Sequence, residues 1–268
     1  MKLRPRTFLA PNASPMTMEG TITHVVGQRI VAIIDPGSAD PAHLDALARV
    51  AGEADRAVII VTHDHPDHST GALELADRTG AALLGGHAGR SGKAAAASRG
   101  SSAPAEVSRA AGGGLLADGV SVQTDEGSLV VVRTPGHAPD HISLHWPEAS
   151  AIFCGDLMMG GLDTAVVAAP EGNIGEYLAS LNRLRSLRPE IIYPAHGPPF
   201  TDPDAAIESY IRHRETRLEQ VREVTRDGEN DADAITDRIY GASLEPALRP
   251  FAVAAVEAYL AHLRRGND

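Results

Sequence analysis

The sequence contains one dense cluster of potential metal ligands. Residues 63–68 read HDHPDH, directly after the apolar run 58–62 (VIIVT). Imidazole is the commonest metal ligand in proteins, and carboxylate oxygens accompany it where a divalent ion serves hydrolysis. Three imidazoles within six residues exceed what structure alone requires. The cluster therefore predicts a metal site, and a hydrated metal site indicates hydrolytic chemistry.

Three further candidate ligands follow other short apolar runs. His137, Asp156 and His196 each come within a few residues of the end of such a run. In layered α/β proteins, functional side chains converge at the ends of strands. We therefore expect these residues to meet the histidine cluster at one edge of the molecule.

The elements that must position these residues follow from the hydrophobic pattern. Short apolar runs ending in turn residues predict strands over 29–35, 58–62, 129–134, 151–154 and 190–193. Spacings of three and four predict helices over 43–50, 71–78 and 174–187, and then over 204–224, 232–240 and 245–264. This order predicts an α/β domain over residues 1–203, followed by a helical module over residues 204–268.

Composition limits the classes of function. The formal net charge of −11 disfavours a protein that coats nucleic acid, without excluding a local basic groove. The single cysteine, Cys154, cannot form a disulfide within the chain and is expected to be a buried, inert thiol. No apolar stretch is long enough to cross a membrane, and the basic N-terminus lacks the apolar core of a signal peptide. We expect a cytoplasmic protein with no membrane partner.

Residues 88–117 differ from the rest of the chain. They are rich in Ala, Ser and Gly and contain almost no large apolar side chains, so they can contribute little to a core. A lid over the site and a plain surface loop are the two interpretations.

Five stretches together resemble the metallo-β-lactamase superfamily, most closely its LACTB2-like and glyoxalase II-like branch. They are 35–37 (DPG), 62–71 (THDHPDHSTG), 134–141 (TPGHAPDH), 155–156 (GD) and 193–198 (YPAHGP). The resemblance implies an α/β fold, a four-layer αββα sandwich, with a small winged-helix-like C-terminal module. It also implies two metal ions, with zinc as the default and Fe or Mn as alternatives.

The same resemblance implies a role for each candidate residue. His63, His65 and His137 would hold the first metal; Asp67, His68 and His196 would hold the second; Asp156 would bridge them beside a shared hydroxide. Asp67 and His141 are the candidate catalytic residues. Asp67 would orient or accept a proton. For His141 we weigh a hydrogen bond to a ligand or oxyanion against a helix cap, and for Asp35 the positioning of a ligand against a plain turn.

Several substrates remain open at this stage. The resemblance implies a binuclear metal-dependent hydrolase in which metal-bound hydroxide attacks a small-molecule ester, thioester or lactone. An endoribonuclease acting on single-stranded RNA is the main alternative, ahead of a diiron redox module and of β-lactam hydrolysis. Homo-oligomerisation is left open. We assign His24, His43, His87, His145 and His262 to the surface or the core, and His213 has no physical role that we can name.

Overall fold

Two five-stranded β-sheets form the centre of the molecule. The computed structural model describes residues 2–85, 116–162 and 164–265. The first sheet has the order β1-β2-β3-β4-β5, and the second has the order β10-β9-β8-β7-β6. The strands of the first are β1 Arg6–Leu9, β2 Ile22–Val26, β3 Ile30–Ile34, β4 Arg56–Val61 and β5 Ala82–Gly85. Those of the second are β6 Ser121–Thr124, β7 Gly127–Arg133, β8 Ile142–Trp146, β9 Ala151–Phe153 and β10 Ile191–Tyr193.

Each sheet mixes parallel and antiparallel pairs. β1 to β3 are antiparallel neighbours, whereas β3, β4 and β5 run parallel. In the second sheet only β9 and β10 are parallel. The five predicted strands correspond to β3, β4, β7, β9 and β10. The other five strands were not predicted.

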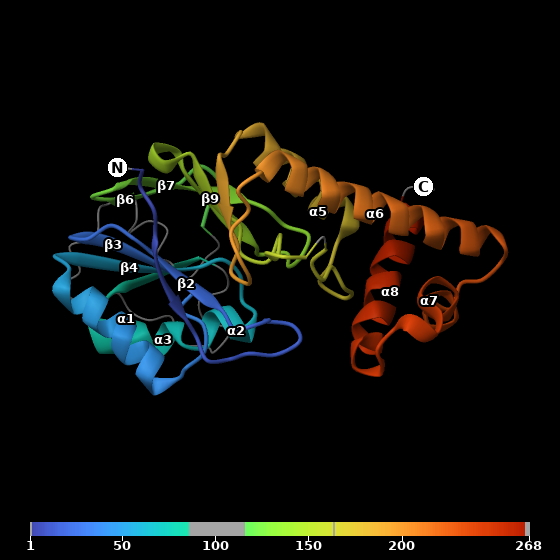
Figure 1. Cartoon of the computed structure of the whole chain (residues 1–268), viewed down its shortest axis with the longest axis horizontal. Helices are drawn as coiled ribbons and strands as arrows, with labels where there is room; N and C mark the ends of the chain where they lie inside the picture. The colour runs from blue at the N-terminus through green and yellow to red at the C-terminus, as the bar shows by residue number, and fades with distance from the viewer. Residues whose placement is uncertain (1, 86–115, 163, 266–268) are drawn as a thin grey trace.

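Helices cover the outer face of each sheet (Figure 1). The helices α1 Pro41–Glu53 and α3 Ala72–Thr79 pack on the first sheet, where Leu44 and Leu75 share a core with Ile59. On the second sheet, α5 Ile174–Ser186 packs through Leu181 against Ile152. The inner faces meet in a third core that includes the only tryptophan, Trp146. These four layers confirm the predicted αββα sandwich.

Three helices form the C-terminal part of the chain, on the right in Figure 1. They are α6 Pro203–Arg226, α7 Ala232–Tyr240 and α8 Arg249–Arg265, with short 3-10 turns at Gly241–Ser243 and Pro246–Leu248. Residues 203–265 are all described and contain no strand, so the likeness to a winged helix is limited to the helices. Ile207 and Tyr259 belong to the same core cluster as Ile152 of the sandwich. The domain boundary at residue 203 stays a prediction.

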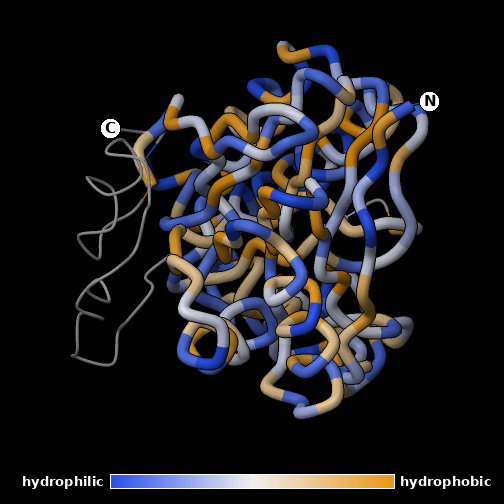
Figure 2. The backbone as a smooth tube through the Cα atoms, turned by 90° about the vertical axis from the view of Figure 1, so that its left-hand side faces the viewer, coloured by the Kyte–Doolittle hydropathy of each residue, from blue (hydrophilic) through white to orange (hydrophobic). Residues whose placement is uncertain are grey.

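Hydrophobic and hydrophilic segments alternate along the chain in short stretches (Figure 2). None of the helices in the described residues combines the length and the apolar character needed to cross a bilayer. The segment 88–117, interpreted as a lid or a surface loop, lies outside the described residues up to position 115. Two short helices complete the fold: α2 Pro66–Ser69 and a 3-10 turn at Pro147–Ala149.

Candidate metal centre

The candidate ligands lie at the ends of four strands, as the sequence pattern predicts. β4 leads into His63 and His65, and α2 then carries Asp67 and His68. The remaining three candidates follow the ends of β7, β9 and β10; they are His137, Asp156 and His196. The structure brings all seven side chains together in two adjacent groups.

The first group consists of three imidazoles. His65 Nδ1 lies 2.9 Å from His63 Nε2 and 3.0 Å from His137 Nε2. Burial lowers the pKa of His63 well below its ordinary value, with further lowering from neighbouring histidines such as His68. A neutral imidazole has one nitrogen lone pair free, and three such nitrogens at this separation match the donor set of a tetrahedral cation.

The second group combines two imidazoles with two carboxylates. His196 Nε2 lies 3.2 Å from Asp67 Oδ2, and His68 Nε2 lies 3.5 Å from the same oxygen. Asp156 Oδ1 lies 3.3 Å from both imidazole nitrogens. Within the described residues, His68 Nε2, His196 Nε2 and Asp156 Oδ1 are buried without a hydrogen-bond partner. Buried polar atoms that point at one another without a partner fit the donor set of a divalent cation.

Asp156 faces both groups. Its Oδ1 belongs to the second group, while its Oδ2 lies 3.8 Å from His137 Nε2 in the first. Burial disfavours ionisation of Asp156, but the neighbouring histidines, above all His68, outweigh burial and lower its pKa. The carboxylate is therefore ionised, with one oxygen directed toward each group of candidate ligands.

Four of the five imidazoles have their other ring nitrogen in contact with a further residue of the protein. His63 Nδ1 lies 3.1 Å from Thr62 Oγ1. His137 Nδ1 donates to the Val166 carbonyl at 2.6 Å, and His196 Nδ1 donates to the Gly20 carbonyl at 3.1 Å. The fourth, His68, contacts Asp35. Because a carbonyl oxygen only accepts, the proton of His137 and of His196 sits on Nδ1, and Nε2 is free to bind a metal.

His65 has the opposite arrangement. Its Nδ1 points into the first group, while its Nε2 lies 3.4 Å from the Glu171 carboxylate. Both side chains are partly exposed. The carboxylate fixes the proton on Nε2, which leaves Nδ1 as the metal-facing atom.

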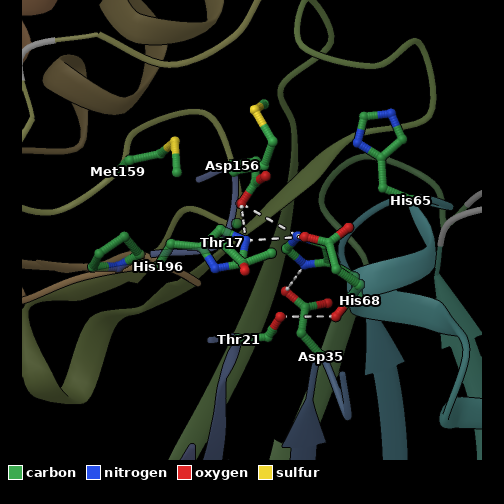
Figure 3. A network of polar contacts seen from close by, with 12 residues as sticks. Thr17, Thr21, Asp35, His65, His68, Asp156, Met159 and His196 are labelled. Carbon is green, nitrogen blue, oxygen red and sulfur yellow. Dashed lines mark hydrogen bonds and ion pairs between the residues drawn. The ribbon is translucent and has the colours of Figure 1, made fainter. Parts of the chain in front are cut away.

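Asp35 positions two residues of the site. It accepts hydrogen bonds from the Thr62 amide at 2.7 Å and from Thr62 Oγ1 at 2.9 Å, and its Oδ2 lies 3.1 Å from His68 Nδ1. Its backbone φ of +51° is in the left-handed region, which costs energy for a residue other than glycine. In Figure 3, Asp35 contacts His68 on the side opposite Asp156 and His196. This placement favours a positioning role over a plain turn.

His141 lies behind the site rather than in it. The side chain is fully buried, and its Nε2 accepts a hydrogen bond from the Asp156 amide at 3.2 Å. Its Nδ1 lies 2.9 Å from Thr134 Oγ1. Burial lowers the pKa of His141 to about 3, so the ring is neutral. With both nitrogens engaged, His141 is placed to hold Asp156 in position, and its catalytic role stays a prediction.

A cavity of about 490 Å³ opens onto both groups. His65, Asp67, His137 and Asp156 line one side of it. The other walls are mostly apolar and come from distant parts of the chain: Met16, Met159, Val166, Pro170, Phe251 and Ala254. The last two belong to α8, so the C-terminal helices contribute to the wall of the cavity.

Sequence reasoning missed several residues of this site. Glu171, Val166 and Gly20 contact the candidate ligands from segments that carry no motif, and two of them act through a backbone carbonyl. Phe251 carried no signal in the sequence; in the structure it is a large apolar side chain that lines the cavity and stays 41% exposed. His24 and His43 are buried away from the two groups, as expected of core residues, and His87 lies outside the described residues.

Known proteins from several organisms are similar to this chain. A sequence model described as the metallo-beta-lactamase superfamily matches residues 19–196. The lactamase-like protein aptB of Emericella nidulans is 30% identical over 80% of this chain, which covers 62% of that protein, less than two thirds of its length. A beta-lactamase-like protein 2 homolog of Drosophila melanogaster is 31% identical over 83% of this chain and 75% of its own length. An atrochrysone carboxyl ACP thioesterase of Aspergillus chevalieri is 29% identical over 83% and 66%.

Solved structures show the same fold. A metallo-beta-lactamase family protein from Thermus thermophilus superposes with a TM-score of 0.72 at 21% identity, over 98% of this chain and 94% of that one. A second protein, solved in a di-iron-bound form, has a TM-score of 0.51 at 27% identity, over 74% and 94%. The match of the family's sequence model to two thirds of the chain, carrying every candidate ligand, shows that this protein belongs to the metallo-beta-lactamase superfamily.

Proposed function

We propose that this metal-dependent hydrolase cleaves a carboxylic ester or thioester whose acyl group is apolar. His63, His65 and His137 would hold one divalent cation, Asp67, His68 and His196 a second, and Asp156 would lie between them. The substrate class rests on the cavity, because candidate ligands line it together with Met, Val, Pro and Phe side chains. Such a cavity binds an apolar group and can place its attached carbonyl near the candidate ligands.

The names of relatives support the thioester over other carbonyl substrates. Two curated relatives that align with about four fifths of this chain are named thioesterases, although the chain spans only 56% and 66% of their lengths. Zinc suits a site of five imidazoles and two carboxylates, and iron is the alternative because the di-iron-bound structure has the same fold. Two bound cations would supply a water of lowered pKa and polarise the substrate carbonyl.

The chain's own residues contribute orientation and proton transfer. Burial alone would raise the pKa of Asp67, but its close contacts with His196 and His68 outweigh burial and lower that pKa, so Asp67 is a carboxylate. Asp67 also lines the cavity, which places an oxygen where it can orient a water or accept its proton. His141 holds the Asp156 amide, so we assign it to positioning. The apolar walls exclude bulk water from the acyl group.

Ribonuclease activity is a weaker proposal. The net charge of −11 disfavours binding to a phosphate backbone. In addition, the arginines of α6 that could contact phosphate already contact other side chains or are buried. Arg212 and Arg222 pair with Glu208 and Glu219, and Arg214 is buried. Arg217 stacks over the Tyr240 ring, 4.4 Å from its centre. Cations occupied in this way contribute little to binding a nucleic acid.

The experiment is a hydrolysis assay on the metal-loaded protein with acetyl, hexanoyl and decanoyl thioesters, a lactone and a single-stranded RNA. We expect kcat/KM to rise with acyl length. Phe251→Ala should reduce the decanoyl-to-acetyl ratio by about tenfold, because it removes apolar contact area from the cavity wall. Asp67→Asn should lower kcat roughly 100-fold or more for every substrate.

The control is Leu73→Ala, which removes a 43% exposed leucine that does not line the cavity and should leave the ratio unchanged. Equal rates for all acyl lengths would contradict the apolar acyl group. Cleavage of RNA alone, lost in Asp67→Asn, would replace this proposal with the nuclease.

A further inference from the structure

A second cavity, of about 680 Å³, lies between the edge strands of the two sheets. β1 is the edge of the first sheet and β10 is the edge of the second, so the sandwich is open at this end. Leu9 and Ile22 line the cavity from the first sheet, and Ile191 and Tyr193 line it from the second. None of the candidate metal ligands lines it.

The second cavity lies directly behind the metal centre. Gly20 and Gly197 line it, and the Gly20 carbonyl accepts the hydrogen bond from the candidate ligand His196. Met16 lines the cavity at the candidate metal centre, and Met18 lines the second cavity, so the loop before β2 lies between the two. An occupant would therefore touch the backbone that orients His196.

The walls suit an aromatic body. Tyr193 stacks on Phe153 with ring centres 5.4 Å apart, which makes its ring a rigid wall. Flat proline rings from three segments complete the apolar lining; they are Pro5, Pro194, Pro198 and Pro199. Aromatic rings and prolines pack well against a planar ligand because they lose little conformational entropy.

His24 supplies a hydrogen-bond acceptor. It lines the cavity and is 4% exposed, and its Nε2 donates to the Pro194 carbonyl at 2.9 Å. Its Nδ1 is buried and has no hydrogen-bond partner within the described residues. Burial lowers the pKa of His24, so the ring is neutral and Nδ1 carries a lone pair. A buried acceptor without a partner favours a ligand that brings a hydroxyl donor.

Two charges stand at the rim. Arg4 and Glu19 both line the cavity and are exposed, and the structure records no ion pair between these two described residues. Arg4 makes no ion pair with any other described residue, so its guanidinium is available for a carboxylate. Arginine binds carboxylates in a bidentate fork, which gives it the stronger influence on an acidic ligand.

We propose that this cavity is a second small-molecule site, which binds an aromatic carboxylic acid bearing a hydroxyl group. The ring lies against Tyr193 and the prolines, the carboxylate pairs with Arg4, and the hydroxyl donates to His24 Nδ1. The site is separate from the hydrolytic cavity and does not depend on which substrate that cavity takes.

The test is calorimetric titration of the metal-loaded protein with 4-hydroxyphenylacetate. We expect one saturable site per chain. Phenylacetate, which lacks the hydroxyl, should bind roughly fivefold more weakly, and Arg4→Ala should weaken 4-hydroxyphenylacetate about tenfold. Arg6→Ala is the matched control, because the Arg6 guanidinium donates to the Gly27 carbonyl and Arg6 does not line the cavity. The Arg6→Ala variant should bind 4-hydroxyphenylacetate with the same affinity as the unmutated protein.

Three results would overturn the proposal. The first is that 4-hydroxyphenylacetate does not bind at millimolar concentration, or that its affinity is the same for Arg4→Ala as for the unmutated protein. The second is tighter binding of tyramine, which carries an ammonium group instead of the carboxylate and would show that Glu19 sets the charge preference. The third is binding lost in Phe251→Ala, which would place the ligand in the hydrolytic cavity.

Discussion

At the scale of residues, the candidate ligands depend on a second layer of contacts. Thr62, Val166, Gly20 and Glu171 each fix the proton of one imidazole, so its other nitrogen faces the site. Such partners hold a ligand in one tautomer and one orientation, and their loss commonly weakens metal binding. Asp35 positions two residues at once, because its two oxygens contact both Thr62 and His68.

Asp35→Asn should weaken binding at the second metal position by roughly 10- to 100-fold, as measured by competition with a metal-binding dye. An amide has one oxygen, so it cannot accept both hydrogen bonds of Thr62 and still contact His68. Asp40→Asn is the control, because Asp40 only caps the N-terminus of α1. Unchanged metal affinity in Asp35→Asn would show that the contact with His68 is incidental.

Sequence could identify the residues of the cluster and offer Asp35 as a positioning residue, but it could not identify the backbone partners of the imidazoles. His63, His65, Asp67 and His68 lie within six positions, so their proximity in space follows directly from the sequence. The partner of His196 is 176 positions away, and it is a backbone carbonyl, which any residue type supplies. Only the packing of the two sheets brings that carbonyl and that imidazole together.

At the scale of elements, α6 fixes the loop that shapes the catalytic cavity. Tyr210 OH donates to the Met159 carbonyl at 2.7 Å and accepts from the Met159 amide at 2.8 Å. Arg214 donates to the Ala165 carbonyl and to Thr164 Oγ1, and the next residue, Val166, holds His137. The helix thus positions the candidate ligand His137 through the loop that carries Thr164, Ala165 and Val166.

Tyr210→Phe should lower the free energy of unfolding by about 1–3 kcal/mol, because it leaves the Met159 amide without a partner in the core. Urea denaturation measures this loss, and thioester hydrolysis should fall with it as the loop loosens. Tyr240→Phe is the matched control, since the Tyr240 ring stacks with Arg217 and keeps that contact. Equal stability of the two variants would show that the Tyr210 hydroxyl does not hold the loop.

The longer helices were predicted well, whereas five strands were missed, both at the sheet edges (β1, β5 and β6) and inside the sheets (β2 and β8). The helix expected over 232–240 was found as α7 Ala232–Tyr240, because its apolar spacing and flanking polar residues mark both ends. β1 Arg6–Leu9 was missed, since it is an edge strand that is mostly exposed and shows no clear alternation. The pairing of β1 with β2 depends on the fold and not on local pattern.

At the scale of the whole molecule, one core joins the sandwich to the C-terminal helices. Ile152 and Leu181 of the sandwich belong to the same buried cluster as Ile207, Val256 and Tyr259 of α6 and α8. An interface buried to this degree ties the stability of one part to the other. Through Phe251 and Ala254, α8 also lines the cavity at the candidate metal centre.

Unfolding should therefore be a single transition. Trp146 reports on the core between the sheets, and circular dichroism at 222 nm (a helix signal) reports largely on the helices, including α6 to α8. We expect the two urea curves to coincide, as for one cooperative unit. Separate midpoints would instead favour two units that divide near residue 203.

The central claim is that this chain holds two divalent cations side by side. Anomalous diffraction from crystals of the metal-loaded protein tests it most directly. We expect two peaks about 3.5–4 Å apart, with Asp156 between them. The first should lie ~2.1 Å from His63 Nε2, His65 Nδ1 and His137 Nε2, and the second should lie beside Asp67, His68 and His196. A single peak, or peaks away from these atoms, would contradict the account.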